Sequence, residues 1–278
     1  MAAPLSEAPA DTRPVFIILL PLMMAVFVAF LVIGVAMPVL PLHVHSGLHL
    51  STFMVGLVAG AQFVAALASR LWSGHVADTR GAKPAVLAGL LAAAVAGLLY
   101  WISLPFVDTP FVSVAILLLG RAVLGGAESF IITGATIWGL ARVGPAHAGK
   151  VIAWMGTAMF AAFAGGAPIG TILYEKEGFG AIAIATLAAP LATMFLMARL
   201  QSVAPPPRNG KPHFLTVIGQ IWRPGLGAAL SSIGFGTVAA FASLLFVERS
   251  WSPVWLAFTA YAGALILARL IFGHVKSH

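Results

Sequence analysis

The chain has 278 residues, of which 60% are hydrophobic and only 8% are charged, and none is cysteine. Because soluble domains carry about 25% charged residues, this composition indicates an integral membrane protein, and the lack of cysteine within these residues excludes disulfides and cysteine-ligated metals. The net charge of +7 is spread among short polar segments instead of clustered, so we predict no nucleic-acid partner.

Long apolar segments follow one another along the chain, and about 20 such residues suffice for a helix to cross a bilayer. They lack the period-two alternation of a membrane β-barrel. We therefore predict an all-α polytopic membrane protein with eight spans, at 15–42, 52–73, 85–104, 111–141, 151–174, 179–200, 225–247 and 252–273. The first span is too long for the core of a cleaved signal peptide, so we expect it to be retained.

Basic residues predict how the spans are oriented, because Lys and Arg gather in cytoplasmic loops. Eight spans place both termini on one side, and most of the 15 Lys and Arg residues fall in segments on that side. They are Arg13, Arg70, Arg80, Lys83, Arg142, Lys150, Arg199, Arg208, Lys211, Arg223, Arg269 and Lys276. The other side has only Lys176 and Arg249, together with Asp108, Glu175, Glu177 and Glu248. Both termini are therefore predicted to be cytoplasmic.

A polar segment with three consecutive prolines, QSVAPPPRNGKPH at 201–213, is typical of an extended linker. The residues after it form one apolar stripe: Phe214, Val217, Ile218, Ile221 and Trp222. This stripe is typical of a helix lying on the membrane surface, and an early start of the seventh span explains it equally well. We divide the chain into six spans at 1–200, a linker with a possible interfacial helix at 201–223, and two spans at 224–278.

One phrase is written twice, as RLWSGHV at 70–76 and RLIFGHV at 269–275. Each copy ends an even-numbered span on the predicted cytoplasmic side. Their equivalent places indicate two homologous parts.

The segment after the second span, GHVADTRGAKP, fits the signature G-x-x-x-D-x-x-G-x-[KR] through Gly74, Asp78, Gly81 and Lys83. It resembles the major facilitator superfamily of secondary transporters, and within it the bacterial arabinose-efflux-like branch of YfcJ/YhhS type. The sequence departs from the signature at Thr79, where the family has a basic residue, and Arg80 follows one place later.

Two further segments carry the resemblance. RAVLGGAES places Arg121 and Gly125 in the family's R-x-x-x-G motif, and AGGAPIG resembles a Gly-Pro motif associated with exporters. Ala167 stands where the strict Gly-Pro pattern has glycine. Close packing or bending of the fifth span is expected from its small residues and proline: Gly165, Gly166, Pro168 and Gly170.

The resemblance implies two six-helix bundles that rock about a central cavity. This chain would hold the first bundle and the first two helices of the second, and we expect that it is truncated, with a deliberate eight-helix architecture as the alternative. It implies a bacterial inner-membrane transporter, with proton-coupled export of a small organic solute as the leading hypothesis. The alternatives are uptake of a sugar or another metabolite by symport, a transport-inactive fragment and, less well supported, a multi-span receptor.

Arg121 and Glu128 lie within the fourth span, where a charge costs about 2.5–3.5 kcal/mol and calls for a partner or a wet cavity. Seven residues separate them by about 10 Å on one helix face. This distance is too long for a direct contact, and it fits two side chains at opposite ends of one cavity. Burial favours the neutral carboxyl group, so Glu128 is the candidate protonation switch, and the resemblance assigns Arg121 to the proton-coupling region. In the alternative, both residues merely hold neighbouring helices.

Several polar and aromatic residues are candidates to line that cavity. They are Gln62, Thr133, Thr136, Trp138 and Trp154. Gln62 is the strongest of them, because an amide within a span needs hydrogen-bond partners. Each of the five has packing between helices as its alternative role.

The signature segment is predicted to act as a gate, in which Asp78 accepts hydrogen bonds from helix N-termini and from basic residues. The full gating set is Gly74, Asp78, Arg80, Gly81 and Lys83. The glycines favour a tight turn there, and a solvated loop carboxylate is the alternative.

His43, His45 and His49 form a weak metal pattern without a nearby carboxylate, and we predict an exposed, functionally neutral loop there. No P-loop, zinc helix or serine elbow occurs in the sequence. We therefore predict no metal, no cofactor and no enzyme activity.

Overall fold

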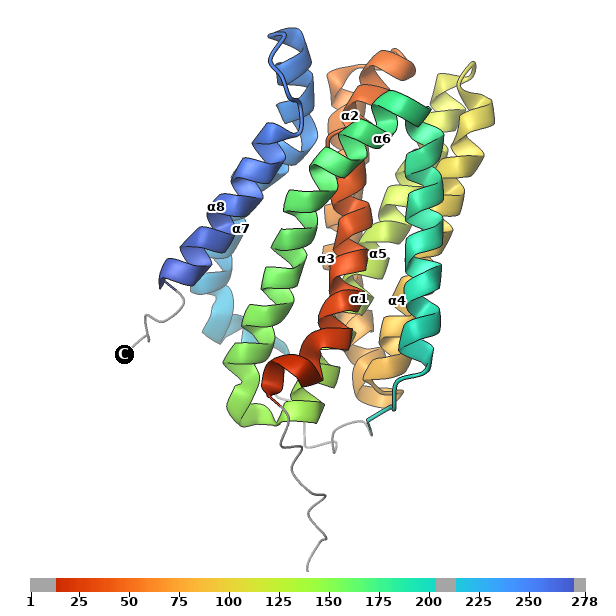
Figure 1. Ribbon diagram of the computed structural model, residues 1–278. Coiled ribbons are helices and arrows are strands. Elements are labelled where there is room, and N and C mark those ends of the chain that lie inside the picture. Colours follow the sequence, from red (N-terminus) through yellow and green to blue (C-terminus); the bar gives the residue numbers. More distant parts are fainter. Residues whose placement is uncertain (1–13, 204–213, 273–278) are drawn as a thin grey trace, which may run out of the picture.

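The computed structural model describes residues 14–203 and 214–272, and every regular element in these ranges is helical. Figure 1 shows long helices lying side by side along one common direction. In chain order they are α1 (Val15–Ala36), α2 (Leu40–Leu42), η1 (His43–Gly47), α3 (Thr52–Thr79), α4 (Ala82–Ser103), η2 (Leu104–Phe106), α5 (Pro110–Val143), η3 (Pro145–His147), α6 (Ala148–Ala198), α7 (Phe214–Glu248) and α8 (Leu256–Phe272). The predicted all-α membrane architecture is confirmed.

The helix α6 doubles back on itself at Gly178, whose φ of 70° lies in the left-handed region that favours glycine. Its two arms correspond to the predicted fifth and sixth spans (Figure 1). Six helical stretches of the described chain are long and apolar enough to cross a membrane, and one of them, Pro145–Ala198, contains both arms. With the shorter apolar helix Leu256–Ala268, every predicted span is accounted for.

Some predicted boundaries were wrong. The second span was expected to end at Ser73, but α3 continues to Thr79, because no proline interrupts it, Ala77 is buried, and the chain leaves the helical conformation only at Gly81, with φ 98°. The eighth span begins later than expected, at Leu256, since Pro253 stands in the turn before it.

The linker and its neighbours are described in part. The helix α7 extends from Phe214 to Glu248, and its stretch that is long and apolar enough to cross a membrane is Gly225–Glu248. The interfacial helix at its start and an early start of the seventh span both stay predictions. Most of the predicted linker at 201–213 lies outside the described residues, as does the end of the second repeated phrase. The division of the chain into domains stays a prediction.

Close crossings between helices depend on glycine. A side chain at Gly170 would overlap the backbone oxygen of Val35 in α1, and one at Gly166 would lie 2.9 Å from the backbone of Gly34. By contrast, nothing in the described structure lies within 4 Å of a side chain built at Gly165. Two of the three glycines predicted for packing therefore bring α1 and α6 together, and Pro168 lies between them inside α6.

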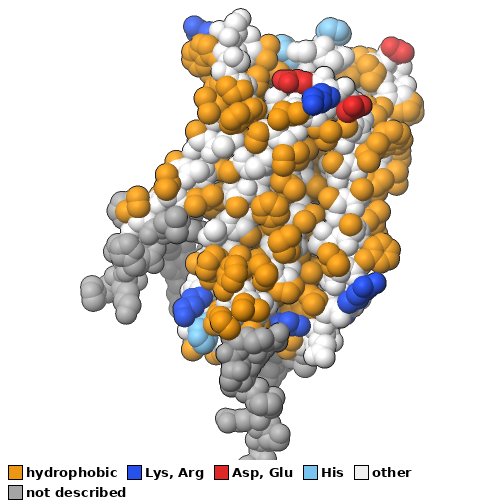
Figure 2. Space-filling view, in the orientation of Figure 1, with side chains coloured by type: hydrophobic (Ala, Val, Ile, Leu, Met, Phe, Trp, Pro, Cys, Tyr) orange, Lys and Arg blue, Asp and Glu red, His pale blue; other side chains and the backbone are white. Residues whose placement is uncertain are grey.

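Charged residues gather at the two ends of the molecule (Figure 2). We call the end with Arg80, Lys83 and Arg142 the basic end, and the end with Glu175 and Glu177 the acidic end. Between them the surface in this view is dominated by hydrophobic side chains, as expected for a lipid-facing belt.

The helices α7 and α8 flank one side of the other helices, with α8 against α6 and α7 against α3. The hydroxyl of Thr259 in α8 donates a hydrogen bond of 2.9 Å to the backbone oxygen of Ala164 in α6. The segments on either side of residues 204–213 therefore pack against each other.

Candidate functional site

A central cavity of about 260 Å³ lies between the first group of helices and the α7–α8 pair. It is lined by Phe30, Gln62, Phe63, Glu128, Met159, Phe160, Phe163, Ser232, Phe235, Tyr261 and Leu265. These residues come from α1, α3, α5, α6, α7 and α8, so the cavity needs helices from both sides of the linker.

Glu128 and Gln62 face each other at this cavity. The Gln62 amide nitrogen Nε2 donates a hydrogen bond of 2.9 Å to Glu128 Oε2, and Gln62 is only 1% exposed. The crossing of α3 and α5 that permits this bond depends on Gly125, where any side chain would overlap the Gln62 backbone oxygen. The R-x-x-x-G glycine therefore positions the amide against the carboxylate.

Glu128 interacts electrostatically with two arginines, Arg70 on α3 and Arg121 on α5. Arg70 follows Gln62 by eight residues, about 12 Å along the helix and about 80° around it, and it is exposed. The sequence indicated only an orientation role for Arg70, and its spacing from Gln62 does not mark it as a site residue.

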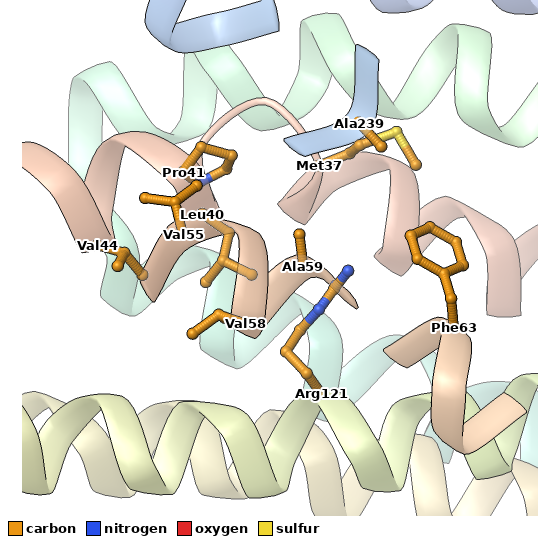
Figure 3. A pocket seen from close by; sticks show the side chains of 10 residues that line it. All are labelled: Met37, Leu40, Pro41, Val44, Val55, Val58, Ala59, Phe63, Arg121 and Ala239. Carbon is orange, nitrogen blue, oxygen red and sulfur yellow. The ribbon is translucent and has the colours of Figure 1, made fainter. Parts of the chain in front are cut away.

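Arg121 occupies a second, much smaller pocket of about 10 Å³, shown in Figure 3. Its guanidinium group points away from α5 among apolar side chains that include Met37, Ala59 and Phe63. Arg121 is 3% exposed, and its Nε and Nη1 atoms have no hydrogen-bond partner among the described residues. A space of this size suits a single water molecule. Arg121 and Glu128 thus face different pockets that share Phe63.

Tyr100 on α4 also belongs to the surroundings of Arg121. It is fully buried, and its side chain interacts with the Arg121 guanidinium group. Sequence analysis did not single out Tyr100, and no local pattern marks a contact between α4 and α5.

A cluster of hydroxyl groups joins α3 to α5 beyond Glu128. Ser73 Oγ lies 3.2 Å from Ser129 Oγ and donates a hydrogen bond of 3.3 Å to Thr133 Oγ1. Ser73 and Ser129 are fully buried. Thr133 therefore joins two helices and is not among the residues that line the central cavity.

Three other residues predicted for the cavity also lie outside its lining. Thr136 donates a hydrogen bond to the Ile132 carbonyl of its own helix, and Trp138 is fully buried with the Arg142 guanidinium 5.7 Å from its ring centre. Trp154 packs on Phe16 with 4.9 Å between ring centres. Trp138 does not line the cavity because ten residues of helix place it about 15 Å from Glu128 along α5.

The signature segment lies at the basic end, partly in helix and partly in a turn. Gly81 adopts φ 98° and begins α4, whereas Gly74 lies within α3 with no described atom within 4 Å of a built side chain. Asp78 lies in the last turn of α3, and Arg80 closes that helix with its N–H 2.8 Å from the Val76 carbonyl. The expected tight turn is therefore formed by Gly81 alone.

Lys83 has a role that sequence analysis did not foresee. Its Nζ donates hydrogen bonds of 2.7 Å to the carbonyls of Ala198 and Leu200 at the end of α6. Arg142 Nη2 adds a bond of 3.2 Å to the Gln201 carbonyl. Cations at a helix C-terminus satisfy its free carbonyls and oppose its dipole, so both side chains hold the start of the linker.

Of the three histidines near the acidic end, His45 and His49 are exposed as predicted, but His43 is not. His43 is 6% exposed and its ring stacks on Phe179 at 4.1 Å, because the chain continues past α1 through short helical turns that face the core. The His45 ring nitrogen Nδ1 lies 2.9 Å from the Leu50 carbonyl. No group of three or more potential ligands that could hold a metal occurs among the described residues.

Comparisons with known proteins agree on one family. The family model described as the Major Facilitator Superfamily matches residues 22–278. The uncharacterized MFS-type transporter STM4428 of Salmonella typhimurium is 40% identical over 245 residues, which cover 88% of this chain and 63% of that protein. The uncharacterized MFS-type transporter YhhS of Escherichia coli is 34% identical over 273 residues, 98% of this chain and 67% of that protein.

A third relative, an uncharacterized MFS-type transporter of Burkholderia mallei, is 37% identical over 258 residues, 91% of this chain and 62% of that protein. The chain thus spans about two thirds of the length of these relatives. With the match to the family model over almost its whole length, this shows that the chain belongs to the major facilitator superfamily.

Proposed function

We propose that the chain belongs to a proton-coupled exporter of a small organic solute that works by alternating access. The observation that carries this proposal is the position of Glu128, a carboxyl group at a cavity between two groups of helices. A buried charge of this kind is costly in a membrane and is typical of ion or substrate pathways. Rocking of α7 and α8 against the other helices would open the cavity to either side in turn.

In the proposed cycle, Glu128 exchanges a proton as its surroundings change. When the carboxyl group is ionised, the Gln62 amide and the charges of Arg70 and Arg121 stabilise it. Protonation removes these electrostatic attractions, so α3 and α5 are held together less strongly around the cavity. The other titratable group that lines the cavity is Tyr261 of α8.

We infer that the basic end faces the cytoplasm of a bacterium and the acidic end faces outward. The charge distribution supports this orientation. In Figure 2 the visible Asp and Glu side chains lie at the acidic end, and the basic end shows Lys and Arg without them, as expected of the cytoplasmic side of a membrane protein. In this arrangement Lys83 and Arg142 hold the end of the first six spans near the gating segment, and Asp78 lies beside them on α3. We propose that this segment stabilises one state of the rocking cycle.

The proposal is tested by proton movement in proteoliposomes of bacterial lipid. A pH-sensitive dye inside the vesicles reports protons that move when small organic cations, sugars or carboxylates are added outside. An exporter exchanges solute for protons, so the interior pH changes in the opposite direction to that expected of an uptake symporter. The variant Glu128→Gln should abolish the signal, whereas Glu177→Gln at the exposed acidic end should not.

Because the chain spans about two thirds of its relatives, the assay is run with this chain alone and with the remaining C-terminal third of the Escherichia coli relative co-expressed. Solute-dependent proton movement in either preparation, lost in Glu128→Gln, supports the proposal. Transport that continues unchanged in Glu128→Gln contradicts it.

A further inference from the structure

We propose that the central cavity binds a small organic cation that carries one flat apolar ring. This inference rests on the proposed function in taking the cavity as the substrate site. It adds the chemical class of the ligand, which neither the family nor the names of the relatives supply. The observations that carry it are a cluster of aromatic rings around the cavity and a single lining carboxylate.

The aromatic rings form a connected cluster that joins five helices, α1, α3, α6, α7 and α8. Phe163 of α6 lies 5.5 Å from Phe30 and 5.7 Å from Phe235, measured between ring centres. Phe235 of α7 in turn lies 5.6 Å from Tyr261 and 6.0 Å from Phe63. All five rings line the cavity. The faces of such rings are electron-rich, so they attract cations and disfavour anions.

The carboxylate gives this cavity its negative charge. Glu128 is the one Asp or Glu among the lining residues, and no Lys or Arg is among them. Gln62 engages Oε2, and Oε1 accepts no hydrogen bond from the described residues. Arg121 points into its own pocket, which shares Phe63 with the cavity, and Arg70 is exposed on α3, so neither arginine is among the residues that line the cavity. An ammonium group can therefore approach Oε1 between aromatic faces.

The size of the cavity limits the ligand. Sites for drug-sized ligands occupy about 300–1,000 Å³, and this cavity, at about 260 Å³, lies just below that range. One ring and one quaternary ammonium group match both the volume and the lining. We therefore choose benzyltrimethylammonium as the probe.

The experiment measures equilibrium binding of this probe to the 278-residue chain in nanodiscs of uncharged phosphatidylcholine. The neutral control is 2-methyl-1-phenylpropan-2-ol, which has the same number of non-hydrogen atoms, and the anionic control is phenylacetate. We expect the cation to bind at least about tenfold more tightly than the alcohol, and phenylacetate to bind more weakly than either.

Variants separate charge from ring contacts. Glu128→Gln should weaken cation binding at least about tenfold while changing alcohol binding less than about twofold. Phe235→Leu keeps an apolar side chain but removes the ring, and it should weaken the cation about three- to tenfold. Phe195→Leu, at a side chain that is 68% exposed, and Glu177→Gln at the acidic end are the matched controls and should leave binding unchanged.

Folding of each variant is checked by its unfolding midpoint, and Glu128→Asp, which keeps the charge, should recover part of the affinity lost in Glu128→Gln. Equal affinity for the cation and the alcohol, or cation binding that survives both Glu128→Gln and Phe235→Leu, would overturn the inference. Cation binding without any proton movement in proteoliposomes would support the inference and count against the proposed function. Proton-coupled transport of another solute, without cation binding, would support the proposed function and overturn the inference.

Discussion

The contact between Gly125 and Gln62 gives the most direct structural prediction, because it sets the distance between α3 and α5 at Glu128. In Gly125→Ala, the new methyl group would overlap the Gln62 backbone oxygen and lie 2.9 Å from its carbonyl carbon and 3.0 Å from the Ala66 nitrogen. Ordinary contacts need about 3.4 Å or more, and all three atoms belong to the backbone, so α3 must move away as a whole.

The size of the effect follows from that displacement. A shift of about 1 Å would stretch the Gln62–Glu128 hydrogen bond from 2.9 Å beyond the limit of a true hydrogen bond. A hydrogen bond to a charged group contributes about 1.5–3 kcal/mol, and overpacking adds about 1–3 kcal/mol. We expect Gly125→Ala to lower the free energy of unfolding by about 2.5–6 kcal/mol.

The measurement is SDS-induced unfolding in mixed micelles, with the neighbouring variant Gly126→Ala as the control. A side chain at Gly126 meets nothing within 4 Å in the described structure, so this variant should be neutral or slightly stabilising, since alanine favours helix. In the double variant Gly125→Ala with Gln62→Leu, the second change should add little, because the bond is already lost. Equal stability of Gly125→Ala and Gly126→Ala, or full additivity with Gln62→Leu, would refute this reasoning.

Three further predictions concern helix packing and the basic end. Gly170→Ala should destabilise the chain by about 2 kcal/mol or more, because its side chain would overlap Val35 in α1. Gly165→Ala should not destabilise it, and thermal unfolding of the two variants tests this difference. Lys83→Met should raise amide hydrogen exchange at residues 200–203 about three- to tenfold, because the bonds at the end of α6 are lost; unchanged exchange would count against the capping role. Gly81→Ala should cost about 1–2 kcal/mol, since φ is 98° there; a loss no larger than that of Gly74→Ala, in the same unfolding assay, would contradict this.

The sequence was sufficient to predict the helices because membrane burial depends on the length and hydropathy of each segment. Gly178 separates the predicted fifth and sixth spans, and the structure turns there. Gln62 and Glu128 were also found, because an amide and a carboxyl group within apolar spans need partners. That they are each other's partner depends on the crossing at Gly125, which no local pattern reveals.

The parts that could not be predicted depend on contacts between distant segments. The rings of Phe30, Phe163 and Phe235 come from three helices, and each alone looks like an ordinary lipid-facing or core residue. Trp138 seemed suited to a cavity but is buried where α5 approaches the basic end. Arg70 fits the pattern of a cytoplasmic basic residue, and its local sequence does not indicate its electrostatic interaction with Glu128.

The central claim is that Glu128 changes its protonation state when the cavity is occupied. Infrared difference spectroscopy measures this directly, because a protonated carboxyl group has a C=O stretching band that the carboxylate lacks. At a pH where wild-type Glu128 is partly protonated, benzyltrimethylammonium should remove intensity from that band, and the change should be absent in Glu128→Gln but present in Glu177→Gln. A band that does not respond to the cation, or a response that persists in Glu128→Gln, would contradict the account.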